Sequence, residues 1–139
     1  MSAEKPQTHA RFDHEKLDVY RLLLEFIGWV SRLLEEVKQA GKGQMGEVRG
    51  QLHRASLSAL LNTAEGNGKR RRPGRAKFFD DARGSATECA ACLDALVAMG
   101  CCQGSRVEDG KTMLVRIVSM LTKLVGRFED PPANATNRT

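Results

Sequence analysis

Four stretches of the sequence place apolar residues at helical spacing, and each stretch ends at a glycine or proline signal. They run from about His14 to Lys38, from about Gly46 to Ala64, from the residue after Pro73-Gly74 to Met99-Gly100, and from about Val107 to Phe128. No stretch alternates with period two over a useful length, so no strand is expected. Four helices joined by short connections predict an all-α, antiparallel up-down-up-down four-helix bundle.

The chain has 139 residues, which is enough for one domain with a modest core. We expect residues 1–12 to be a flexible N-terminal arm, residues 13–129 to form the bundle, and residues 130–139 to be a flexible tail. No window approaches the roughly 18 apolar residues of a membrane span, and the first residues lack the apolar core of a signal peptide. We therefore expect a cytoplasmic protein without a membrane partner.

The first predicted helix is apolar over more of its circumference than a bundle helix needs. One apolar row consists of Tyr20, Leu23, Leu24, Ile27, Val30, Leu34 and Val37, and a second consists of Val19, Leu22, Phe26, Trp29 and Leu33. Together the rows cover an arc of about 220°, whereas a stripe a little over 100° wide is enough to face one core. The second row either lies under the N-terminal arm, stays exposed, or forms a subunit interface. We favour the interface, and hence a homo-oligomer, because an exposed row of this size exceeds what a monomer usually leaves open.

The third predicted helix is rich in small residues, including Ala82, Gly84, Ala86 and Ala90. A glycine inside a helix costs about 1 kcal/mol relative to alanine, so Gly84 calls for an explanation. We expect the small residues to let a neighbouring helix approach closely.

Two motifs follow one another around the middle of the chain. The first is Asn62-Thr-Ala-Glu-Gly-Asn-Gly68, and the second is Phe78-Phe-Asp-Asp-Ala-Arg-Gly-Ser-Ala-Thr-Glu88. They closely resemble the patterns N-x-A-E-G-x-G and F-x-x-x-A-R-G-S-x-x-E of the bacterial four-helix-bundle family first noticed as proteins encoded in intervening sequences of 23S ribosomal RNA genes. The motif residues to which we assign structural roles are Asn62, Glu65, Gly66, Gly68, Arg83, Gly84, Ser85 and Glu88.

The resemblance covers about Phe12 to Phe128 and implies a bundle that assembles as a ring-like homopentamer. The family is also distantly similar to the accessory variability determinant of diversity-generating retroelements, which partners a reverse transcriptase and nucleic acid. The resemblance therefore implies the fold, and it raises RNA, DNA or a reverse transcriptase as partners of this chain.

Charged residues of the two motifs are expected to meet where the second and third helices join. Glu65 lies near the end of one helix, while Arg83 and Glu88 lie on the next. An ion-pair network that fixes helix register is the favoured interpretation, and a ligand or catalytic site is the alternative.

The excess positive charge of the chain, +5, comes from one segment. Between residues 69 and 77, six of nine residues are basic and none is acidic: Lys69, Arg70, Arg71, Arg72, Arg75 and Lys77. The sequence predicts a basic loop, which is either a solvated charge run or a patch that binds nucleic-acid phosphates. Because no aromatic residue is interleaved in this segment, contacts mainly to backbone phosphates are expected.

Other chemistries find little support in the sequence. Gly66-Asn-Gly-Lys69 lacks the spacing of a nucleotide-binding loop. Cys89, Cys92, Cys101 and Cys102 lack the spacing of a zinc site and are interpreted as reduced, packed thiols. The three histidines match no catalytic motif. We therefore expect no enzyme activity, no catalytic residue, no metal and no cofactor. The favoured function is binding of RNA or a ribonucleoprotein through the basic loop, and the alternative is a protein-interaction scaffold.

Overall fold

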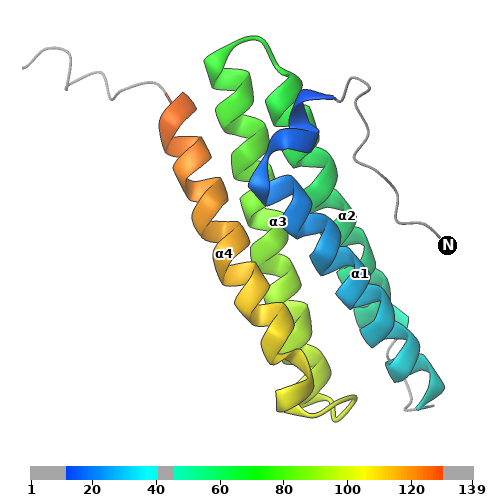
Figure 1. Ribbon diagram of the computed structural model, residues 1–139. Coiled ribbons are helices and arrows are strands. Elements are labelled where there is room, and N and C mark those ends of the chain that lie inside the picture. Colours follow the sequence, from blue (N-terminus) through cyan, green and yellow to red (C-terminus); the bar gives the residue numbers. More distant parts are fainter. Residues whose placement is uncertain (1–11, 41–45, 130–139) are drawn as a thin grey trace, which may run out of the picture.

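A computed structural model describes residues 12–40 and 46–129, and these fold as a bundle of four helices (Figure 1). The helices are α1 (Asp18–Gln39), α2 (Gly46–Gly68), α3 (Arg72–Ala98) and α4 (Gly104–Phe128). Each helix runs antiparallel to the next, and α4 packs against both α3 and α1. The predicted all-α four-helix bundle is therefore confirmed. Within the described ranges, no helix is long and apolar enough to cross a membrane.

Two predicted segments fall largely outside this description. Residues 1–11 of the expected arm and residues 130–139 of the expected tail are not among the described residues, and neither are residues 41–45 between α1 and α2. Phe12 is described, and it precedes a short 3-10 helix, η1 (Asp13–Lys16), that packs against α1 and α2.

The core is built unequally by the four helices. Helices α1 and α4 supply most of its large side chains, which are Leu22, Leu23, Phe26, Trp29, Leu33, Leu114, Ile117 and Leu121. These residues recur at intervals of three and four, so each helix presents one apolar side to its neighbours. The predicted apolar stripe of the last helix is thereby confirmed.

Helices α2 and α3 pack closely because many of their facing residues are small. Ala59, Ala82 and Ala86 are fully or almost fully buried. A Cβ atom added at Gly66 would lie 3.1 Å from both Phe78 and Phe79, so a larger residue would push against α3 and glycine favours this close approach to α2. The expected close approach is therefore present, although Gly84 does not take part: an added Cβ there meets no described atom within 4 Å.

The structure corrects four predicted helix boundaries, one of which is the start of α4, at Gly104 rather than near Val107. The first turn from His14 belongs to the separate helix η1 rather than to α1. Helix α2 continues past Ala64 to Gly68, because Gly66 is a packing contact inside the helix and not a stop. Helix α3 begins at Arg72, before Pro73, since the fixed φ of proline and its missing N–H suit the first turn of a helix.

The predicted subunit interface on α1 is wrong. The row Val19, Leu22, Phe26, Trp29 and Leu33 lies inside the bundle, with exposed fractions of 2%, 5%, 0%, 7% and 1%. The two aromatic rings stack on each other with centroids 5.8 Å apart and fill the space between helices. These side chains are therefore buried in the core of the bundle and cannot form a surface for another subunit.

A tight contact between α1 and α4 explains why the largest of these side chains fits. A Cβ atom added at Gly110 would lie 2.3 Å from the Trp29 ring, so the indole lies directly on the backbone of α4. Gly110 thus makes room for Trp29 within the core.

Candidate nucleic-acid interface

The six predicted cations lie at one end of the bundle but do not share a loop. Only Lys69, Arg70 and Arg71 connect α2 to α3. Arg72, Arg75 and Lys77 stand on the first two turns of α3. The predicted loop over residues 69–77 is therefore wrong from Arg72 onward, and the structure gives these cations different environments.

The two lysines are held by neighbouring carboxylates and by one ring. Lys69 Nζ lies 3.1 Å from Glu65, and Lys77 Nζ lies 3.0 Å from Asp81, each a pair four residues apart. Both ammonium groups also lie over the Phe78 ring, at 4.9 and 5.3 Å from its centroid. These contacts partly neutralise both lysines and reduce their electrostatic attraction for a phosphate.

Arg72 and Arg75 connect α3 to other helices. Arg72 donates a hydrogen bond of 2.6 Å to the backbone carbonyl of Arg127 at the end of α4. The Arg75 guanidinium lies 4.3 Å from the centroid of the Phe128 ring and donates a 3.1 Å hydrogen bond to Asn67. The Nε atom of Arg75 is buried and has no hydrogen-bond partner among the described residues. Both arginines thus fix the geometry of this end of the bundle.

Arg70 and Arg71 differ from the other four cations. Both side chains are exposed, and within the described residues neither has a salt bridge or a side-chain hydrogen bond. Arg71 is the N-cap of α3, where no side chain caps the helix, and the first turn contains no acidic residue. The free backbone N–H groups of a helix N-terminus attract anions, so an anion here would meet two arginines and the helix end together.

The motif residues do not form the expected polar cluster. Glu65 pairs with Lys69, Arg83 pairs with Asp80, and Glu88 accepts a hydrogen bond from Gln51. Because Glu88 lies more than one helical turn beyond Arg83 on α3, their side chains find separate partners.

The remaining motif residues serve packing and local hydrogen bonding. The hydroxyl groups of Ser85 and Ser58 lie 2.8 Å apart, joining α3 to α2, and Asn62 donates 2.9 and 3.0 Å hydrogen bonds to Ser58. Gly66 gives α3 its close approach, whereas Gly68 and Gly84 have open space around them. Asn62, Ser85 and Gly66 are thus structural residues, and no described contact explains Gly68 or Gly84.

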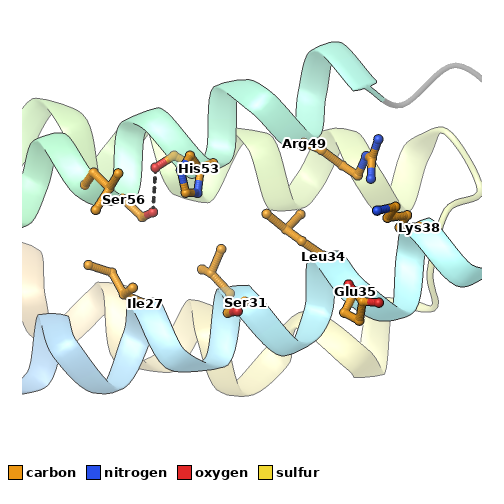
Figure 2. A pocket seen from close by; sticks show the side chains of 10 residues that line it. Ile27, Ser31, Leu34, Glu35, Lys38, Arg49, His53 and Ser56 are labelled. Carbon is orange, nitrogen blue, oxygen red and sulfur yellow. Dashed lines mark hydrogen bonds between the residues drawn. The ribbon is translucent and has the colours of Figure 1, made fainter.

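An apolar surface between α1 and α2 lies outside the predicted interface. Leu24, Leu57 and Leu61 are exposed by 47%, 36% and 62%, and we call these three residues the leucine surface. A groove of about 320 Å³ runs on from Leu57 between the same two helices, and Ile27 and Leu34 also line it. Figure 2 shows Ile27, Ser31 and Leu34 of α1 facing α2 across this groove. Its polar lining residues are Ser31, Glu35, Lys38, Arg49, His53 and Ser56.

The cysteines are part of the apolar core. All four are free thiols, and Cys89, Cys92 and Cys101 are buried. Burial raises the pKa of the Cys89 thiol to about 12, which disfavours the reactive thiolate. No three His, Cys, Asp or Glu side chains among residues 12–40 and 46–129 are grouped as a metal site would require.

Two features near the ends of the bundle escaped the sequence interpretation. At one end, Phe12, His14 and Tyr20 form a continuous aromatic stack. At the other, Arg106 of α4 forms a salt bridge with Glu36 of α1. The sequence analysis placed Phe12 in a flexible arm and His14 at a helix start, so it did not predict that their rings would stack. The salt bridge joins residues 70 positions apart, and no local sequence pattern predicts such a pair.

A protein-family model matches most of the chain. The family model described as 23S rRNA-intervening sequence protein matches residues 15–123, which is most of the chain and includes all of α1, α2 and α3. No curated protein matches the chain.

Proposed function

The chain belongs to the 23S rRNA-intervening sequence protein family, and on that premise we propose that it binds the phosphate backbone of nucleic acid, RNA or a ribonucleoprotein, without being an enzyme. The binding surface is the turn between α2 and α3 together with the first turns of α3. Its cations are Lys69, Arg70, Arg71, Arg72, Arg75 and Lys77.

The exposure of Arg70 and Arg71, and the lack of an ion-pair partner for either in the described part of the chain, carry this proposal. A guanidinium that already holds a carboxylate must exchange one partner for another, whereas an exposed, unpaired one releases only its counterions on meeting a phosphate. Arg70 and Arg71 are therefore the principal phosphate contacts, and Lys69, Arg72 and Lys77 add to the field around them.

Arg72 and Arg75 support the same surface by fixing its structure. Arg72 and Arg75 tie the start of α3 to Arg127 and Phe128 at the end of α4. This holds the N-terminus of α3 in place, so the two exposed arginines extend from a fixed base and lose less freedom on binding.

Gel retardation tests the proposal. The double variant Arg70→Ala/Arg71→Ala is compared with Arg32→Ala/Arg116→Ala, which removes two exposed arginines elsewhere on α1 and α4 and so matches the change in net charge. We expect the first pair to abolish or strongly weaken retention of RNA at low salt and the second to leave it nearly unchanged. Equal retention by both variants, or no retention by the wild-type chain, contradicts the proposal and favours the protein-interaction scaffold.

We also infer that the chain is a homo-oligomer, the family resemblance implying a pentamer, and that copies associate through the leucine surface rather than through the buried row of α1. Exposed leucines beside an apolar groove give such an interface its core, and the polar residues along the groove give it a rim. A closed ring would repeat the basic end of the bundle around its axis and strengthen binding to one nucleic acid.

Light scattering at micromolar concentration tests the assembly. The variant Leu57→Arg/Leu61→Arg is expected to be monomeric, while Met99→Arg, at an exposed apolar residue of the far end, keeps the wild-type mass. A monomeric wild-type chain, or an oligomer that survives both leucine substitutions, overturns the inference.

A further inference from the structure

An exposed aromatic stack stands at the basic end of the bundle. The Phe12 and His14 rings are stacked, with centroids 5.6 Å apart and planes inclined by 20°. His14 in turn meets the Tyr20 ring edge-on, with centroids 4.7 Å apart. Phe12 is the most exposed large apolar residue among those described, at 74%. One face of its ring stacks on His14, and most of the side chain remains exposed.

Hydrogen bonds hold this stack in place. The Phe12 backbone N–H donates to Glu15 over 2.8 Å, which closes the turn around helix η1. Asn67 on α2 donates a 2.8 Å hydrogen bond to Asp13 and accepts one of 3.1 Å from Arg75 on α3. The chain Asp13, Asn67, Arg75 thus joins the aromatic stack to the two helices that carry the cations.

The aromatic stack and the two exposed arginines lie at the same end of the bundle. Asp13 directly follows Phe12, and its partner Asn67 stands two residues before Lys69, where the turn of cations begins. Figure 1 shows η1 and the start of α3 at the same end of the bundle.

An exposed aromatic ring beside unpaired arginines is the combination that binds unpaired nucleotides. A base stacks on the ring while the adjoining phosphates meet the cations. Bases inside a duplex are already stacked on their neighbours and offer no free face, so a duplex uses only the cations.

We propose that the chain prefers single-stranded over duplex nucleic acid, with one unpaired base stacked on the open face of Phe12 and its neighbouring phosphates on Arg70 and Arg71. This inference rests on the proposed function and adds a base contact to the backbone contacts. Because stacking engages the π-face that every base has, the preference is for strand state and not for sequence.

Fluorescence anisotropy with two labelled probes tests this inference. The probes are a 12-nucleotide oligouridylate and a 12-base-pair RNA duplex. Each is titrated with the wild-type chain and with Phe12→Ala, Phe12→Trp, Met99→Ala and Arg70→Ala/Arg71→Ala. Met99 is 51% exposed at the far end of the bundle, so its substitution controls for loss of an exposed apolar side chain.

The wild-type chain is expected to bind the oligouridylate more tightly than the duplex. Phe12→Ala should weaken binding of the oligouridylate about 5-fold to 100-fold and leave duplex binding unchanged, since stacking of one base is lost. Phe12→Trp keeps an aromatic ring at this position, so it should bind the oligouridylate about as tightly as the wild type. The fluorescence of the introduced tryptophan should be quenched when the oligouridylate is added. Met99→Ala should match the wild type.

The two proposals fail in different ways. If Arg70→Ala/Arg71→Ala weakens binding of both probes equally and Phe12→Ala changes the binding of neither, the stacking inference is overturned. The proposed phosphate-binding surface is then still supported. Failure of the wild-type chain to bind either probe overturns both. Because Phe12 is largely exposed, Phe12→Ala should keep the wild-type melting temperature, which confirms that any lost binding is not lost folding.

Discussion

At the end of the bundle where α3 leads into α4, the Arg106 side chain is held by Glu36 and Trp29, whereas at the opposite end the side chains of Arg70 and Arg71 contact no partner among residues 12–40 and 46–129. Arg106 donates two hydrogen bonds of 2.7 Å to the Glu36 carboxylate and lies 5.4 Å from the centroid of the Trp29 ring. Arg70 and Arg71 have no such partners within the described residues. The same residue type therefore builds the fold at one end and remains available for a ligand at the other.

Removing the ring beneath Arg106 should have the largest effect on stability. Trp29→Ala deletes a side chain that is 7% exposed and leaves a cavity, so the free energy of unfolding should fall by about 3–5 kcal/mol. Val115→Ala, at a residue of α4 that is 70% exposed and outside the leucine surface, serves as control and should have a much smaller effect. Urea denaturation followed by circular dichroism measures both. A wild-type midpoint for Trp29→Ala would show that the far end does not depend on this core.

Filling the space at Gly110 should have the next largest effect. Gly110→Ala puts a Cβ atom against the Trp29 ring, and overpacking of this kind costs about 1–3 kcal/mol, offset in part by the higher helix propensity of alanine. Gly126→Ala, on the same helix with open space around it, isolates the propensity and should raise the melting temperature. If both variants melt higher than the wild type, the close contact at Gly110 does not exist.

Breaking the salt bridge should have a smaller effect that depends on pH. Arg106→Ala removes the hydrogen bonds that, with its charge, hold the pKa of the Glu36 carboxyl below its ordinary value of 4.5. A carboxyl whose pKa is lower in the folded state stabilises the fold above its unfolded pKa, and this contribution is lost as pH falls through the lowered value. The difference in melting temperature between wild type and Arg106→Ala should therefore be full at neutral pH and shrink below about pH 4.5. A difference that does not change with pH contradicts the role assigned to Glu36.

Removing the free arginines should have the smallest effect on stability. Arg70→Ala/Arg71→Ala deletes two exposed side chains without described partners, so the free energy of unfolding should change by no more than about 0.5 kcal/mol. Thermal melting beside Arg106→Ala makes the comparison direct. A larger loss would mean that Arg70 or Arg71 has a structural role like that of Arg106, and the contrast between the two ends would be lost.

The sequence was enough to predict the helices but not which face of a helix would be buried. The spacing of apolar residues located all four helices. A helix that buries one side repeats its apolar residues about every 3.6 positions, whichever element it packs against. On α1, however, both rows were apolar and both contribute to the core: the second row is buried, and so are Leu23, Val30 and Val37 of the first, whereas Leu24 is left at the surface. The packing of Trp29 over Gly110, 81 residues away, belongs to this arrangement and has no signal in the local sequence.

The candidate site was predicted in composition but not in structure. The cluster of cations is a local property of residues 69–77, and the sequence located it correctly. Its division into roles depends on contacts from elsewhere, such as Arg127 for Arg72 and Phe128 for Arg75. The aromatic stack at Phe12 reaches this end only through the bond between Asp13 and Asn67, which joins residues 54 positions apart.

The dependence of RNA binding on salt tests most directly whether Arg70 and Arg71 are the free arginines that contact phosphates. The logarithm of the association constant for the 12-nucleotide oligouridylate is measured against the logarithm of salt concentration, for the wild type and for Arg70→Ala/Arg71→Ala. Each phosphate contact with a single strand contributes about 0.7 to the slope, so loss of two contacts should make the slope shallower by about 1.4 and weaken binding most at low salt. If the wild type and the double variant gave the same slope and the same association constants at every salt concentration, the account would be contradicted.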